Sequence, residues 1–135
     1  MPDTIQLEIV TPERLVVQDA VTEVQIPGKN GYLGILPGHA PLITELSVGE
    51  LSYRINGLSH YLAMAWGFAE VLPTRVTILA ETAERAEDID VERARRAKEK
   101  AEQMLHSNDP NTDFARALEA LKHAEVRLDV AGKRG

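Results

Sequence analysis

The chain has 135 residues, of which 44% are hydrophobic, 27% charged and 4% aromatic, and its formal net charge is −6. This is the composition of an ordinary soluble globular protein of about one domain. The sequence contains no cysteine, which excludes disulfides, thiolate metal sites and cysteine nucleophiles, and its acidic balance argues against nucleic-acid binding, which needs clustered Lys and Arg.

The chain divides after residue 85 into two segments of different composition. Residues 1–85 carry 10 Asp and Glu against 5 Lys and Arg, whereas residues 86–135 carry 11 against 10. Seven of the nine glycines and six of the seven prolines fall in the first segment. We therefore expect strands and turns in residues 1–85 and helices in residues 86–135.

The first segment predicts an antiparallel β-sandwich or flattened barrel. Alternating or β-branched runs predict strands over residues 5–9, 15–17, 21–26, 51–55, 61–65, 68–72 and 76–79. Asn56 and Gly57 separate two alternating runs, which predicts a tight hairpin because both residues accept a positive φ. Short strands about ten residues apart, with no helical period between them, are typical of such sheets.

The second segment predicts an antiparallel pair of helices. Apolar residues recur three or four positions apart, which predicts one helix over residues 90–106, with Asp90 as its N-cap, and a second helix from Phe114 to about Gly132. The breaker residues 107–111 join them. A pair this small is not stable on its own core, so we expect it to pack on the sandwich, a partner or a ligand.

Motifs for catalysis are missing from the sequence. It contains no Gly-x-Ser-x-Gly, no Walker loop and no Gly-x-Gly-x-x-Gly. The four histidines include no close pair, so we expect no metal site and no catalytic residues. No segment approaches the roughly 20 apolar residues of a membrane span, so we expect no direct membrane insertion. Residues 1–4 lack the features of a secretory signal.

An apolar segment rich in glycine and proline covers residues 28–42. It embeds Tyr32, Leu33, Ile35 and Leu36 among four glycines and two prolines. Two interpretations remain open at this point. The segment is either an irregular strand pair that completes the sandwich or an exposed apolar surface that contacts a partner.

Two basic stripes run along the predicted helices. They consist of Arg93, Arg96 and Lys100 on the first helix and Arg116, His123 and Arg127 on the second. If the helices fold back on each other, the stripes could converge on an anion such as a nucleoside triphosphate, with Asp90 left to accept a hydrogen bond from an amine or hydroxyl. The alternative is a solvated face of ion pairs, because glutamates are interleaved with the basic residues.

Three short motifs stand in a specific order and spacing. They are residues 34–42 (GILPGHAPL), residues 67–71 (GFAEV) and the run from residues 76–80 (VTILA) into residues 89–94 (IDVERA). With these motifs the chain resembles the epsilon subunit of bacterial F-type ATP synthase along its whole length. The resemblance implies an N-terminal β-sandwich followed by a C-terminal helical hairpin, in agreement with the division drawn from composition.

The resemblance also implies a rotor subunit with no active site of its own. The sandwich is expected to bind the gamma subunit at the foot of the central stalk and to touch the ring of c subunits, which couples proton-driven rotation to ATP synthesis at the cytoplasmic face of the bacterial plasma membrane. The hairpin is expected to lie folded or to extend into the alpha/beta catalytic hexamer, where it inhibits ATP hydrolysis. Our candidate contact residues are Tyr32, Leu33 and His39.

In some bacterial members of the family ATP binds the folded hairpin through a motif that begins Ile/Leu-Asp-x-x-Arg-Ala. The implied ATP-binding residues are Glu84, Ile89, Asp90, Arg93, Ala94, Lys100, His123 and Arg127. ATP-binding members have arginine at the positions of Lys100 and His123. Lysine lacks the bidentate fork and neutral histidine lacks the charge, so we expect weaker ATP binding. ATP is thus the expected regulatory ligand, and no cofactor is required.

Other functional classes remain open beside the rotor subunit. One is a stand-alone nucleotide-responsive regulator, with the sandwich as scaffold and the hairpin as sensor. Another is a small sandwich enzyme, although the sequence offers it no nucleophile, metal or acid–base pair. Copurification with alpha, beta and gamma chains from membranes distinguishes the rotor subunit from the regulator.

Overall fold

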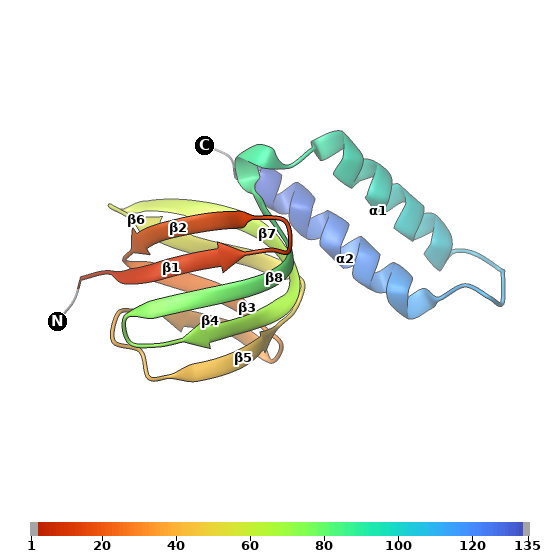
Figure 1. The fold of residues 1–135 in the computed structure, drawn as a ribbon. Coiled ribbons are helices and arrows are strands. Elements are labelled where there is room, and N and C mark those ends of the chain that lie inside the picture. The colour runs from red at the N-terminus through yellow and green to blue at the C-terminus, as the bar shows by residue number, and fades with distance from the viewer. Residues whose placement is uncertain (1–2, 134–135) are drawn as a thin grey trace.

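The computed structural model describes residues 3–133; Met1, Pro2, Arg134 and Gly135, which end the two predicted segments, lie outside the described residues. Strands are followed in the chain by two helices that lie to one side of them (Figure 1). The strands are β1 (Ile5–Val10), β2 (Leu15–Val21), β3 (Glu23–Gly28), β4 (Gly31–Ile35), β5 (Leu42–Leu46), β6 (Gly49–Ile55), β7 (Leu58–Val71) and β8 (Arg75–Arg85). The helices are the 3-10 turn η1 (Ala86–Asp88), α1 (Val91–Leu105) and α2 (Phe114–Ala131).

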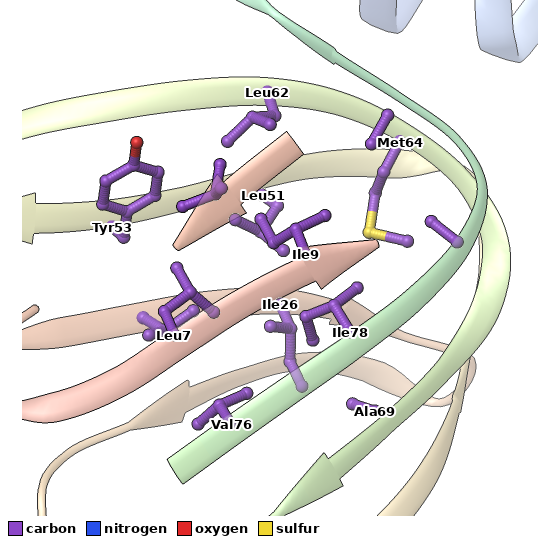
Figure 2. Packing of buried hydrophobic residues seen from close by; sticks show 14 of the residues in the cluster. Leu7, Ile9, Ile26, Leu51, Tyr53, Leu62, Met64, Ala69, Val76 and Ile78 are labelled. Atoms are coloured by element: carbon purple, nitrogen blue, oxygen red, sulfur yellow. The ribbon is translucent and has the colours of Figure 1, made fainter. Parts of the chain in front are cut away.

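The alternation of the sequence places one face of each strand in a common core. In β1, Ile5, Leu7 and Ile9 are buried while the residues between them are only half-buried, as period-two patterning requires. Figure 2 shows Leu7 and Ile9 among side chains contributed by β3, β6, β7 and β8. Because burial of one such aliphatic side chain contributes about 2 kcal/mol, this main core makes the sandwich the stable part of the molecule.

The sheet closes on itself through long-range pairing. Its strand order is β2-β1-β8-β7-β5-β3-β4, and β6 pairs with both β3 and β7. The predicted β-sandwich or flattened barrel followed by two helices is therefore confirmed. One pairing is parallel rather than antiparallel: β1 runs alongside β8 from Gln6 opposite Arg75 to Val10 opposite Leu79. The local sequence patterns did not indicate this contact.

Several strand boundaries differ from those expected, and β8 extends to Arg85, well beyond the expected residues 76–79. Val21 ends β2, and β3 begins at Glu23. The runs expected as separate strands over residues 61–65 and 68–72 form the single strand β7. Trp66 adopts a φ of 49° there, while pairing with β8 continues at Ala65 and Gly67 on either side.

Gly67 permits the close approach of β7 to β8. A Cβ atom at this position would lie 1.9 Å from the carbonyl oxygen of Leu79 and 2.9 Å from the Cα of Ala80.

The predicted Asn-Gly hairpin between β6 and β7 is confirmed, because Asn56 and Gly57 have φ of 52° and 78°.

Each helix starts at an aspartate and packs through alanines. Asp90 accepts a hydrogen bond from the backbone N–H of Arg93 at 3.1 Å, so the predicted N-cap is confirmed. Asp113 caps α2 in the same way. The buried alanines at the interface are Ala94 and Ala101 on α1 and Ala117 and Ala124 on α2. Their spacing of seven residues keeps them on one face of each helix, and their small size allows close packing.

The hairpin is attached to the sandwich mainly by α2. Its attachment is a small apolar cluster, here called the seat, of Ala63, Ala86, Ile89, Val130 and Ala131, with Tyr61, Val91 and Val126 packed against it. The other end of the hairpin, where α1 ends and α2 begins, projects away from the strands (Figure 1).

Beside the seat, Lys133 Nζ lies 2.5 Å from Glu50 Oε1 and 4.9 Å from the ring centre of Tyr61. The hydrogen bond to Glu50 raises the pKa of Lys133.

Within residues 3–133, no helix is long and apolar enough to cross a bilayer.

Candidate functional site

A cleft of about 440 Å³ lies where the hairpin meets the sandwich. Its charged and titratable residues are Glu13 and Arg14 from the β1–β2 turn, Glu84 from β8, Arg93 from α1, and His123 and Arg127 from α2. We call this the basic cleft, because three arginines and one histidine face two carboxylates. Both segments of the chain contribute to it, so the complete cleft exists only when the hairpin is docked.

Arg127 and Glu84 form the closest ion pair of the basic cleft. Arg127 Nε lies 2.7 Å from Glu84 Oε1, and Nη2 donates a hydrogen bond to Oε2 at 3.1 Å. The side chain of Arg127 is only 11% exposed and that of Glu84 is 30% exposed. The Nη2 contact is a charge-assisted hydrogen bond and the Nε contact is an ion pair. A charge-assisted hydrogen bond is stronger than a neutral one, so this pair fixes α2 on β8.

His123 lies beside the same pair. Its ring meets the Trp66 ring edge-on, with 6.1 Å between ring centres, and its Nε2 is buried with no hydrogen-bond partner among the described residues. Burial lowers the pKa of His123 below its ordinary value and the positive charge of Arg127 lowers it further, while Glu84 acts in the opposite direction. The imidazole is therefore neutral at neutral pH.

Of the expected ATP-binding residues, the structure brings four together. They are Glu84, Arg93, His123 and Arg127, which all line the basic cleft. Ile89 is buried in the seat, and Ala94 is buried between the helices. Asp90 is exposed, with one carboxylate oxygen committed to capping α1.

Lys100 also lies outside the basic cleft. It lines a second cleft of about 630 Å³ near the end of the hairpin that lacks contact with the sandwich, together with Arg116. Seven residues separate it from Arg93, which is about 10 Å along a helix. The two basic stripes thus open onto two clefts instead of converging on one.

Sequence reasoning did not find the contribution of the β1–β2 turn. Arg14 lines the basic cleft, and its guanidinium lies 4.0 Å from Asp88. The segment Thr11-Pro12-Glu13 signals a turn, but nothing in it indicates proximity to β8. The parallel pairing of β1 with β8 carries this turn to the edge of the cleft.

A separate apolar surface crosses the outside of the sheet. Leu15 pairs with Val10, Val10 with Leu79, and Leu79 with Phe68, so four apolar residues stand side by side on four neighbouring strands. We call this row the apolar ladder. Leu15 is 49% exposed, and Leu79 and Phe68 are each 56% exposed. Exposed apolar surface of this extent is typical of protein contact sites.

Within the segment of residues 28–42, residues 31–35 form β4, and residues 36–41 connect β4 to β5 without strand structure. β4 pairs with β3 through a tight turn, Gly28 opposite Gly31. Tyr32 is 59% exposed and its hydroxyl accepts a hydrogen bond from the backbone N–H of Glu50 at 3.1 Å, whereas Leu33 packs against the main core. His39 is half-buried, and its Nδ1 lies 2.6 Å from the carbonyl oxygen of Ala40. Leu36, which was not among our contact candidates, is as exposed as Tyr32.

Metal binding has no visible basis in the part of the chain that the structure describes. Among residues 3–133, no group of three or more His, Asp or Glu side chains could hold an ion. The basic cleft instead offers nitrogen donors and positive charge, which suit a phosphate or carboxylate ligand.

Comparison with known proteins gives one consistent result. Residues 4–86 match the family described as ATP synthase, delta/epsilon chain, beta-sandwich domain, and residues 87–132 match its long alpha-helix domain. The ATP synthase epsilon chain of Koribacter versatilis is 67% identical over 110 residues, which cover 82% of this chain and 78% of that one. The epsilon chain of Solibacter usitatus is 47% identical over 134 residues, covering 99% and 100%.

A solved structure agrees with these relatives. A chain in the complex of OSCP, F1 and c-ring of the Euglena gracilis mitochondrial ATP synthase is similar to this chain, with a TM-score of 0.82 and 27% identity, over 97% of this chain and 82% of that one.

Proposed function

The chain belongs to the ATP synthase delta/epsilon family, and from this premise we propose that it is a central-stalk rotor subunit of a bacterial proton-translocating ATP synthase. The sandwich sits on the gamma subunit and touches the c-ring, and it couples rotation of the ring to ATP synthesis at the cytoplasmic face of the plasma membrane. The observation that carries the proposal is the match of both segments of the chain, in order, to the two domains of the family.

The apolar ladder is the surface proposed for gamma. It presents Leu15, Leu79 and Phe68 about half exposed on adjacent strands, and burial of apolar surface contributes about 25 cal/mol per Å². The β3–β4 hairpin is the surface proposed for the c-ring, because Tyr32 and the nearby Leu36 are exposed there. Two separate apolar surfaces suit a subunit placed between two partners.

The hairpin is proposed as the regulatory element. It is held by the small seat and by the Arg127–Glu84 and Lys133–Glu50 pairs, whereas the main core contains only residues of the sandwich. Release of the hairpin therefore leaves the sandwich folded. The released hairpin extends into the alpha/beta hexamer and inhibits ATP hydrolysis.

ATP is the proposed ligand of the basic cleft. The guanidinium groups of Arg14, Arg93 and Arg127 face the cleft from three different elements, and arginine is well suited to bind phosphate oxygens. Because both segments of the chain form the cleft, a bound nucleotide stabilises the docked hairpin. At 100 times its dissociation constant, a ligand adds about 2.7 kcal/mol to the state that binds it.

Copurification from membranes tests the rotor assignment. A tagged chain expressed in its own host should bring down alpha, beta and gamma chains in fixed proportion. Recovery of the chain alone from the soluble fraction would support the stand-alone regulator instead.

Truncation of the hairpin tests the regulatory assignment. A chain ending at Ala86, assembled into the complex, should leave proton-coupled synthesis intact and raise ATP hydrolysis. Unchanged hydrolysis by a complete complex would contradict an inhibitory hairpin.

A further inference from the structure

His123 contributes unused hydrogen-bonding capacity to the basic cleft. Its Nε2 is buried without a partner, and burial of an unpaired polar atom is unfavourable. The ring is held in place by the edge-on contact with Trp66. A ligand with acceptor oxygens in this cleft would supply the partner that the protein does not.

The charges around His123 decide when it binds a proton. They come from every element that lines the cleft: Glu13 and Arg14 of the β1–β2 turn, Glu84 of β8, Arg93 of α1 and Arg127 of α2. Glu84 is already bound by Arg127. Burial is the largest cause of the lowered pKa of His123, and Arg127 adds to it. In the absence of an anion, a proton on His123 is therefore unfavourable in the docked state.

We propose that nucleotide binding in the basic cleft is coupled to proton uptake by His123, so that the docked hairpin responds jointly to ATP and to pH. The inference rests on the proposed nucleotide site. Phosphate oxygens supply negative charge and accept a hydrogen bond, and both favour the imidazolium over the neutral ring. An arginine at this position would keep its charge in this pH range and would lack the coupling.

The direction of the effect follows from thermodynamic linkage. A proton on His123 and a nucleotide in the cleft each raise the affinity for the other by the same factor. ATP affinity therefore rises as the pH falls, by about tenfold per pH unit at most for one coupled proton. Acidification alone opposes docking of the hairpin, and bound ATP weakens this opposition.

Calorimetry of the full-length chain tests the coupling. ATP without Mg²⁺ is titrated near pH 7 in buffers of different ionisation enthalpy, and the dependence of the measured heat on the buffer gives the number of protons taken up. His123→Arg is the matched control, because it keeps a positive charge that cannot be lost in this pH range. Protons taken up by ATP itself are common to both proteins.

The wild-type chain should take up more protons than His123→Arg, by a fraction of one per ATP. As the pH is lowered from about 8 to about 6, the ATP affinity of the wild-type chain should also rise more steeply than that of His123→Arg. This window spans the ordinary histidine pKa of about 6.5. His123→Gln should bind ATP more weakly than wild type at the acidic end and show the proton uptake of His123→Arg.

A second measurement needs no variant. The imidazole resonances of the wild-type chain are followed with pH by NMR, with and without saturating ATP, and the pKa of His123 should rise on saturation. ATP binding with equal proton uptake in wild type and His123→Arg, or with an unchanged His123 pKa, would overturn this inference and leave the nucleotide site standing. No ATP binding by either protein at millimolar concentration would overturn the nucleotide site itself.

Discussion

Arg127 of α2 contacts both carboxylate oxygens of Glu84 on β8, with Nε 2.7 Å from Oε1 and Nη2 3.1 Å from Oε2. The two residues are 43 positions apart in the sequence and belong to different segments of the chain. The pair therefore forms only when the hairpin is docked. A substitution that removes the pair tests how much it contributes to docking.

Glu84→Gln should weaken docking of the hairpin. The substitution leaves the mostly buried guanidinium of Arg127 without a charged partner, which costs about 2 kcal/mol in a partly exposed pair of this kind. Amide hydrogen exchange in α2, measured without nucleotide, should become about tenfold or more faster. Arg95→Gln, which removes an exposed pair with Glu92 on α1, should change exchange by less than about twofold. Equal effects of the two variants would contradict the role of the Glu84 pair.

The alanine contact between the helices should not tolerate a larger side chain. Ala117 is buried against α1, so Ala117→Leu forces the helices apart and destabilises the hairpin by about 2 kcal/mol. Ala115 is exposed on the same helix, and Ala115→Leu provides the control with the same added volume. Amide hydrogen exchange in α1 is measured for both variants. If both lose the same protection, the close contact between α1 and α2 at Ala117 is ruled out.

Gly67 should be indispensable to the sandwich. Gly67→Ala places a Cβ 1.9 Å from the carbonyl oxygen of Leu79, which forces β7 away from β8 and costs about 3 kcal/mol. Gly34→Ala is the control, because a Cβ there meets nothing within 4 Å. Chemical denaturation of the two variants should show the difference in the free energy of unfolding, and similar midpoints would contradict the strand contact.

Docking of the hairpin should weaken on acidification when no nucleotide is present. The pKa of His123 is lowered in the docked state, whereas a released His123 has the ordinary value of about 6.5. The docked state then binds fewer protons, so this contribution to docking is complete above about pH 6.5 and is lost as the pH falls towards the docked pKa.

Distances between spin labels on α1 and β4 measure this pH response. The docked fraction should fall between about pH 7.5 and about pH 5.5 in wild type and should change less in His123→Gln. An identical pH response in the two proteins would assign the effect to other groups.

The apolar ladder should determine binding to gamma. Phe68 and Leu79 are each about half exposed, and loss of one well-buried apolar contact weakens an interface by about 1.5 kcal/mol, or roughly tenfold. Phe68→Ser and Leu79→Ser should each reduce binding to gamma with little change in unfolding free energy. Leu58→Ser alters an even more exposed apolar residue at the β6–β7 turn, and a loss of binding as large as that of Phe68→Ser would contradict the assignment.

Local patterns in the sequence predict most of the fold. The alternation in residues 5–9, the Asn56-Gly57 turn and the Asp90 cap each depend on interactions within a few residues, and all three are found in the structure. Pairing over long distances has no such signal. The parallel contact of β1 with β8 and the bend of β7 at Trp66 depend on how the whole sheet closes.

The basic cleft was predictable only in part, for the same reason. Arg93, His123 and Arg127 lie on helix faces that the helical period aligns, so the sequence could suggest their convergence. Arg14 enters the cleft through the pairing of β1 with β8, which no local pattern encodes. Lys100 has the expected charge and lies on a predicted stripe, but it is too far along α1 to reach the others.

The parallel pairing of β1 with β8 has a consequence for biosynthesis. The first strand to leave the ribosome pairs with β2 but waits for its second partner, β8. That partner is translated about 70 residues later, and contacts between such distant segments slow folding. The sheet becomes complete only after Arg85 has emerged, and the seat needs Val130 and Ala131 in addition. The sandwich can therefore be complete before the hairpin docks on it.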